Sequence, residues 1–91
     1  MNDHELGRAM LEALRESKSP SHVEDLVAVA RGLGVDAWPQ ITRVADELQR
    51  RGYVEDFEPS EQAILARISD QGRQALESGG PKIDHRESVG G

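Results

Sequence analysis

The chain has no cysteine among its 91 residues, so it can form neither disulfide bonds nor thiolate metal sites. It also lacks a long apolar run. Its first residues, MNDHELGRAMLEALRES, mix acidic, basic and apolar side chains, and no other segment approaches the roughly 20 apolar residues that a membrane helix needs. We therefore expect neither a signal peptide nor a membrane span, and we expect a soluble cytoplasmic protein without a membrane partner.

Basic residues are few in this chain. Eleven lysines and arginines stand against seventeen aspartates and glutamates, which gives a formal net charge of −6. This balance argues against sequence-independent binding of nucleic acid by the whole surface, because such binding depends on neutralising phosphates. The charge is also unevenly distributed. Residues 35–54 hold three basic and three acidic residues, whereas residues 55–80 hold two arginines and six acidic residues, a net −4.

Groups that support catalysis or metal binding are not clustered in the sequence. The histidines His4, His22 and His85 stand in separate segments, and none has the spacing of a zinc ligand. The serines fall in turns and helix caps, and no glycine-rich phosphate loop follows a strand. We expect no metal site, no cofactor, no catalytic residue and no enzyme activity.

The first segment with helical spacing runs from about His4 to Glu16, with Asn2 or Asp3 as its cap. A domain this short is only marginally stable alone and gains from association. The helix carries more apolar surface than one small core needs. We therefore favour a homodimer through this N-terminal helix over the alternative, in which the whole apolar stripe packs inside one chain. The stripe consists of Leu6, Met10, Leu11 and Leu14.

Two further helices are expected before the middle of the chain. Ser21 and Glu24 have the spacing of a capping box and predict the start of a second helix. Asp36 is the expected cap of a third helix, over about residues 36–51. For Trp38 we favour packing at the edge of the core over contact with a base or a partner. The apolar stripe of the third helix contains Trp38, Ile41, Val44, Ala45 and Leu48.

The segments YVEDFE (53–58) and AILARI (63–68) mix apolar and polar positions and predict two strands joined by the turn PSEQ. Ser69 then caps a short last helix. This order predicts an α+β domain over residues 1–78, with a three-helix core, a two-stranded β-hairpin and a short C-terminal helix. Residues 79–91 are polar and rich in glycine, so we expect a disordered tail.

Three motifs carry a resemblance to a known family. ITRVADELQRRGYVE, from Ile41 to Glu55, resembles the recognition helix and following strand of winged helix-turn-helix transcription regulators of the MarR-like and PadR-like kind. RISDQGRQAL resembles the strand-to-helix signature of that family, and VEDLVAVARGLGV resembles the first helix of its helix-turn-helix. The likeness covers roughly residues 6–78. Each motif is weak alone, but the three follow one another in the family's order and spacing.

The resemblance implies a DNA-binding transcription regulator. Its recognition helix, about residues 36–51, would enter the major groove of double-stranded DNA, and the hairpin wing would touch the backbone. This wing, however, is acidic where the family usually presents a basic residue to phosphate. The alternative is therefore an acidic winged-helix module that binds another protein through the wing, without binding DNA. The acidic residues are Glu55, Asp56, Glu58 and Glu61.

Six residues are the predicted DNA contacts. At 100° per residue, the side of the third helix opposite its apolar stripe carries Arg43, Asp46 and Arg50. Gln and Arg side chains can read purines through paired hydrogen bonds, and arginines also suit phosphates. The alternative is a solvated surface of ion pairs between residues four apart, with Arg67 bonded to neighbouring carboxylates. The predicted base contacts are Gln40, Thr42 and Arg43, and the predicted phosphate contacts are Arg50, Arg51 and Arg67.

Overall fold

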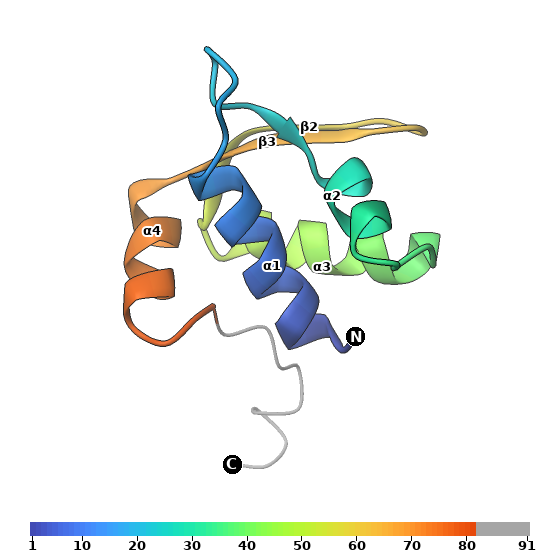
Figure 1. The fold of residues 1–91 in the computed structure, drawn as a ribbon, viewed down its shortest axis with the longest axis horizontal. Coiled ribbons are helices and arrows are strands. Elements are labelled where there is room, and N and C mark those ends of the chain that lie inside the picture. The colour runs from blue at the N-terminus through green and yellow to red at the C-terminus, as the bar shows by residue number, and fades with distance from the viewer. Residues whose placement is uncertain (82–91) are drawn as a thin grey trace.

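The computed structural model describes residues 1–81. In order, the elements are α1 (Asp3–Arg15), β1 (Glu24–Asp25), α2 (Leu26–Gly32), α3 (Trp38–Arg50), β2 (Val54–Pro59), β3 (Ile64–Ile68) and α4 (Asp70–Glu77). Figure 1 shows the sheet running along one side of the helices. Within the described residues, four helices and a three-stranded antiparallel sheet confirm the predicted α+β class, and the arrangement is compatible with a small winged-helix-like fold.

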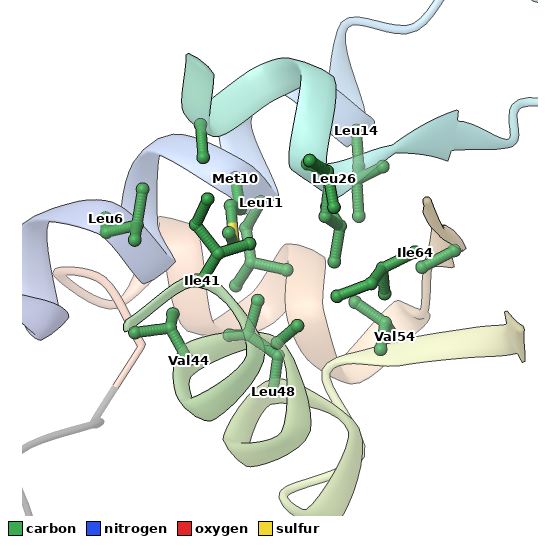
Figure 2. Close-up of a cluster of buried hydrophobic side chains, with 14 of the residues drawn as sticks. Leu6, Met10, Leu11, Leu14, Leu26, Ile41, Val44, Leu48, Val54 and Ile64 are labelled. Carbon is green, nitrogen blue, oxygen red and sulfur yellow. The ribbon is translucent and has the colours of Figure 1, made fainter. Parts of the chain in front are cut away.

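α1 begins at a capping box. The Asn2 side chain accepts a hydrogen bond from the backbone N–H of Glu5, and the Glu5 carboxylate accepts one from the backbone N–H of Asn2. The apolar stripe of α1 lies in the core between α2, α3 and the strands (Figure 2). One chain therefore uses the whole stripe itself, and a dimer through α1 would have to form on its polar side. The buried stripe comprises Leu6, Met10, Leu11 and Leu14.

The segment before α2 differs from the prediction. Glu24 and Asp25 pair with β3 as a short strand, so the expected capping box of Ser21 and Glu24 is wrong. Asp25 caps α2 instead, because its Oδ1 accepts hydrogen bonds from the backbone N–H groups of Val27 at 2.9 Å and Ile64 at 3.0 Å. One carboxylate thus ties the start of α2 to the start of β3. The hairpin is part of a sheet in the order β1-β3-β2, not a two-stranded appendage.

β2 and β3 confirm the two strands predicted from the sequence. Glu55 lies opposite Arg67, and the register resumes with Glu58 opposite Leu65. Two residues of β2 therefore face one residue of β3, which is a β-bulge. Asp56 lies in this bulge with φ +53°, a left-handed conformation that aspartate tolerates better than most residues.

The start of α4 is joined to the end of α3. Ser69 caps α4 as predicted, because its Oγ accepts a hydrogen bond from the backbone N–H of Gly72 at 3.0 Å. The same hydroxyl donates to the carbonyl oxygen of Gly52 at 2.6 Å, and Gln71 Nε2 donates to that of Arg51 at 2.8 Å. Carbonyl groups that the end of α3 leaves without helical partners are thus satisfied from α4.

The predicted tail begins with an ordered turn. Gly79 and Gly80 both have φ of +109°, a conformation that suits glycine at the end of a helix. Pro81, which follows them, is buried. The rest of the predicted tail, residues 82–91, lies outside the described residues.

Candidate nucleic-acid interface

α3 has one side in the core and one side in solvent. Arg43 and Arg50 are about two helical turns apart and lie on the solvent side. Trp38 is half-buried and packs against the core, as we expected. The predicted apolar stripe is confirmed, because Ile41, Val44, Ala45 and Leu48 are fully buried. The exposed residues are Pro39, Arg43, Asp46, Gln49 and Arg50.

The start of α3 has no side-chain cap. Ala37 occupies the capping position, so the predicted cap by Asp36 is wrong, and Asp36 pairs with Arg31 at 3.6 Å instead. The hydroxyl of Thr42 donates a hydrogen bond to the carbonyl oxygen of Trp38 at 3.0 Å, within the same helix. Because this bond uses the hydroxyl proton, contact of Thr42 with a base has to use its oxygen as an acceptor.

Asp3, at the start of α1, joins two of the predicted DNA contacts on α3. Arg43 donates from Nε to Asp3 Oδ2 at 2.8 Å and from Nη2 to Oδ1 at 2.9 Å. Gln40 donates from Nε2 to Asp3 Oδ1 at 3.2 Å and to the carbonyl oxygen of Met1 at 2.8 Å. The hydrogen bonds to Asp3, and then its charge, raise the pKa of Arg43. The start of α1 therefore lies directly against the first half of α3.

Glu47 holds the two arginines at the end of α3. Its Oε1 accepts from Arg50 Nη2 and its Oε2 from Arg51 Nε, both at 2.6 Å. Glu47 is buried, although it is a charged residue. The hydrogen bond from Arg51 lowers the pKa of Glu47 below its ordinary value of 4.5; burial acts in the opposite direction, and the charges of both arginines lower it further. Arg50 also lies 4.0 Å from Asp46.

Arg67, the predicted phosphate contact on the hairpin, is bonded to two acidic residues of β2. Its Nη2 lies 2.7 Å from Asp56 Oδ2 and 3.4 Å from Glu55 Oε1. Its Nε is buried and has no hydrogen-bond partner within residues 1–81. The guanidinium group is thus paired with carboxylates of the same hairpin. The exposed acidic residues of the hairpin are Glu55, Asp56, Glu58 and Glu61.

The six predicted contacts fall into three places and are organised by two carboxylates, of which sequence reasoning missed the role of Asp3. Asp3 was considered only as a helix cap, and its pairing with a residue 40 positions later leaves no local pattern. Glu47 did leave a signal, since arginines follow it at three and four residues. Gln40, Thr42 and Arg43 lie in the first half of α3, Arg50 and Arg51 lie at its end, and Arg67 lies on β3.

Among residues 1–81, no three histidine, cysteine, aspartate or glutamate side chains are placed to hold a metal ion. No helix of that region has the length and apolarity needed to cross a bilayer. Comparison with protein-family models, with curated proteins and with solved structures gave no match. The function therefore has to be argued from the geometry of α3 and the hairpin.

Proposed function

We propose that the protein binds duplex DNA as a transcription regulator, with α3 in the major groove. α2 and α3 are joined by a short turn, as in a helix-turn-helix, and the major groove is wide enough to admit an α-helix. α3 has a solvent side, which carries Arg43 and Arg50. The hairpin and the sequence resemblance to winged-helix regulators support the same proposal.

The observation that most supports this proposal is that, in two ion pairs of α3, the arginine side chain is more exposed than its acidic partner. The Arg43 side chain is 50% exposed while that of Asp3 is 21% exposed. The Arg50 side chain is 62% exposed while that of Glu47 is 6% exposed. In both pairs the carboxylate lies beneath and the guanidinium lies outside. Asp46 is an exception on this side of α3, because its side chain is 61% exposed, about as exposed as that of Arg50.

Arginines held in this way can still bind a second acceptor. A guanidinium has five N–H donors, and Arg50 bonds to Glu47 through Nη2 alone. A phosphate can therefore approach Nη1 of Arg50 while the bond to Glu47 stays intact. We assign Arg43 to the bases and Arg50 and Arg51 to phosphates.

In the hairpin the acidic partners are more exposed than the arginine. Arg67 is 39% exposed, whereas its partners Glu55 and Asp56 are 52% and 55% exposed. Carboxylates are thus the outermost charges, and they repel phosphates at short range. We therefore propose that Arg67 makes no phosphate contact and that α3 carries the DNA interaction without help from the wing.

Fluorescence anisotropy with a labelled random-sequence duplex at low salt tests this function. We expect the protein to bind, and we expect Arg50→Ala to weaken binding several-fold, because one phosphate contact is lost. Arg15→Ala is the matched control, since Arg15 is exposed at the end of α1 and its loss changes the net charge equally. No binding by the unaltered protein, or equal weakening by both variants, would contradict the proposal.

A second candidate function, binding of a basic protein through the hairpin, is favoured by the neutralised Arg67. Glu58 and Glu61 are exposed and neither is paired to Arg67. The variant with Glu58→Lys and Glu61→Lys separates the two functions. If the hairpin binds a basic protein, this variant loses a partner that the unaltered chain retains at stoichiometric amounts, whereas Arg50→Ala keeps it. If α3 binds DNA, Arg50→Ala weakens binding to duplex DNA, whereas the variant with Glu58→Lys and Glu61→Lys retains it.

A further inference from the structure

We infer that Asp3 is a positioning residue that presents Arg43 to a guanine base, an inference that rests on the proposed DNA-binding function. The two side chains come from different helices, and the start of α1 lies beside α3 (Figure 1). Asp3 holds Arg43 through two nearly equal bonds of 2.8 and 2.9 Å, so the plane and the direction of the guanidinium are fixed.

The bonds to Asp3 use one particular edge of the guanidinium. They involve Nε and one N–H of Nη2, which together form the side of the group. A guanidinium has five N–H donors, so the edge made by Nη1 and the second N–H of Nη2 stays available. Arg43 is half exposed and Asp3 lies deeper, which leaves this second edge as the one that can meet a ligand from solvent.

Two parallel donors at fixed spacing match guanine better than the other bases. In the major groove guanine presents two neighbouring acceptors, O6 and N7. Adenine presents one acceptor beside an amino donor, which would oppose an arginine N–H, and cytosine presents a donor. An arginine that cannot rotate is therefore selective for guanine, whereas a mobile arginine can turn to a phosphate instead.

Gln40 has a supporting role in this arrangement rather than the base-reading role that we expected. Its Nε2 donates to Asp3 Oδ1 and to the carbonyl oxygen of Met1, which uses both of its N–H groups. Paired contacts to adenine need a free donor on this amide. Gln40 thus helps to fix the Asp3 carboxylate through Oδ1, the oxygen that also accepts from Arg43 Nη2, and the base contact falls to Arg43.

The experiment is selection of binding sites from a random duplex pool with four proteins: the unaltered chain and the variants Asp3→Asn, Asp46→Asn and Arg43→Lys. We expect the unaltered chain to select sites with one invariant guanine, favoured about 5- to 150-fold over other bases. Asp3→Asn should lose most of this preference, to within about threefold, because one of the two oxygens that accept the arginine bonds becomes an NH2 donor. Arg43→Lys should lose it as well, since an ammonium is not bidentate.

Asp46→Asn is the matched control. It also removes one negative charge beside the exposed side of α3, but Asp46 is paired with Arg50 and the pair of Asp3 with Arg43 is left unchanged. It should keep the guanine preference. The inference is overturned if Asp3→Asn selects the same guanine as strongly as the unaltered chain. A second result would also overturn it: Asp3→Asn keeps the guanine preference and binds every sequence more tightly than Asp46→Asn does. Asp3 would then compete with DNA for Arg43 instead of positioning it.

The same data separate this inference from the proposed function. If no protein enriches any sequence and none binds the pool, the DNA-binding function itself fails. If the unaltered chain enriches sites that lack an invariant guanine, DNA binding stands and the role of Asp3 fails. Thermal unfolding of each variant, followed by circular dichroism, shows that the compared proteins are folded at the temperature of selection.

Discussion

Gly72 of α4 lies so close to Tyr53 that a Cβ atom on Gly72 would stand 2.2 Å from the Tyr53 carbonyl oxygen. The same position is 2.9 Å from Cγ1 of Ile68. The Tyr53 carbonyl is held in place, because it accepts the backbone N–H of Ser69 at 3.0 Å. α4 therefore approaches the start of β2 to a distance that only a residue without a side chain permits.

We expect Gly72→Ala to lower the free energy of unfolding by about 1–3 kcal/mol, because the added methyl group overpacks a fixed backbone contact. Gly32→Ala is the control, since nothing lies within 4 Å of the position of its Cβ and Gly32 ends α2. That change should be neutral or stabilising by up to about 1 kcal/mol, as for other replacements of helical glycine. Urea unfolding measures both. Equal stability of the two variants would show that α4 moves away easily.

Asp56 provides a prediction about the bulge in β2. Its φ of +53° is strained for most residues, at about 1–2 kcal/mol, but not for glycine. Asp56→Ala and Asp56→Gly both remove the ion pair with Arg67, so the comparison between them isolates the backbone term. We expect the alanine variant to be less stable than the glycine variant by about 1–2 kcal/mol in urea unfolding. The reverse order would mean that the bulge does not keep this conformation in solution.

The helices α1, α3 and α4 and the hairpin could be predicted because their signals are local. Apolar periodicity, a serine cap and turn residues act within a few positions of one another. β1 could not be predicted, because a strand of two residues has no pattern of its own. Glu24 and Asp25 form a strand by pairing with Ala66 and Leu65, about 40 residues later in the chain. The local pattern of a capping box at Ser21 was therefore overridden by pairing across the sheet.

The candidate site shows the same division. The solvent side of α3 follows from its 3.6-residue period, and Arg43 and Arg50 lie there as predicted. Their partners follow from it only in part: the pairs of Arg50 with Asp46 and of Arg51 with Glu47 have the spacing of four residues that the alternative gave. A spacing of four residues would also pair Arg43 with Glu47, but Arg43 pairs with Asp3 from another helix, and Glu47 pairs with Arg50 and Arg51. Which acid an arginine binds is decided by the packing of α1 on α3.

Glu47 predicts how the stability of the fold depends on pH. Its pKa is lowered in the folded protein, so the folded state binds this proton more weakly than the unfolded state does. The contribution of Glu47 is therefore fully present above its ordinary pKa of 4.5 and is lost as the pH falls through its lower folded value. We expect Glu47→Gln to lower the free energy of unfolding by about 1–3 kcal/mol at neutral pH, because two charge-assisted hydrogen bonds are lost.

The acid side of this experiment separates charge from packing. As the pH falls from 4.5 through the lower folded pKa of Glu47, the difference between Glu47→Gln and the unaltered chain should shrink, since below that folded pKa both carry an uncharged side chain at this position. Asp46→Asn, at an exposed pair 4.0 Å long, should change stability by less than about 0.5 kcal/mol throughout. If the loss of stability in Glu47→Gln stays the same at acid pH, Glu47 stabilises the fold through its packing and not through its charge.

The number of phosphate contacts predicts the salt dependence of DNA binding. If Arg50 and Arg51 contact phosphates and the hairpin does not, the logarithm of the binding constant should fall against the logarithm of the salt concentration with a slope of about −2 per chain. Arg50→Ala should bring the slope to about −1. Glu58→Lys adds a cation to β2, where Glu58 is exposed. If the hairpin makes no contact with the DNA phosphates, as we propose, this change should leave the slope unchanged. A slope that steepens by about 1 in Glu58→Lys would instead place the hairpin against the phosphates.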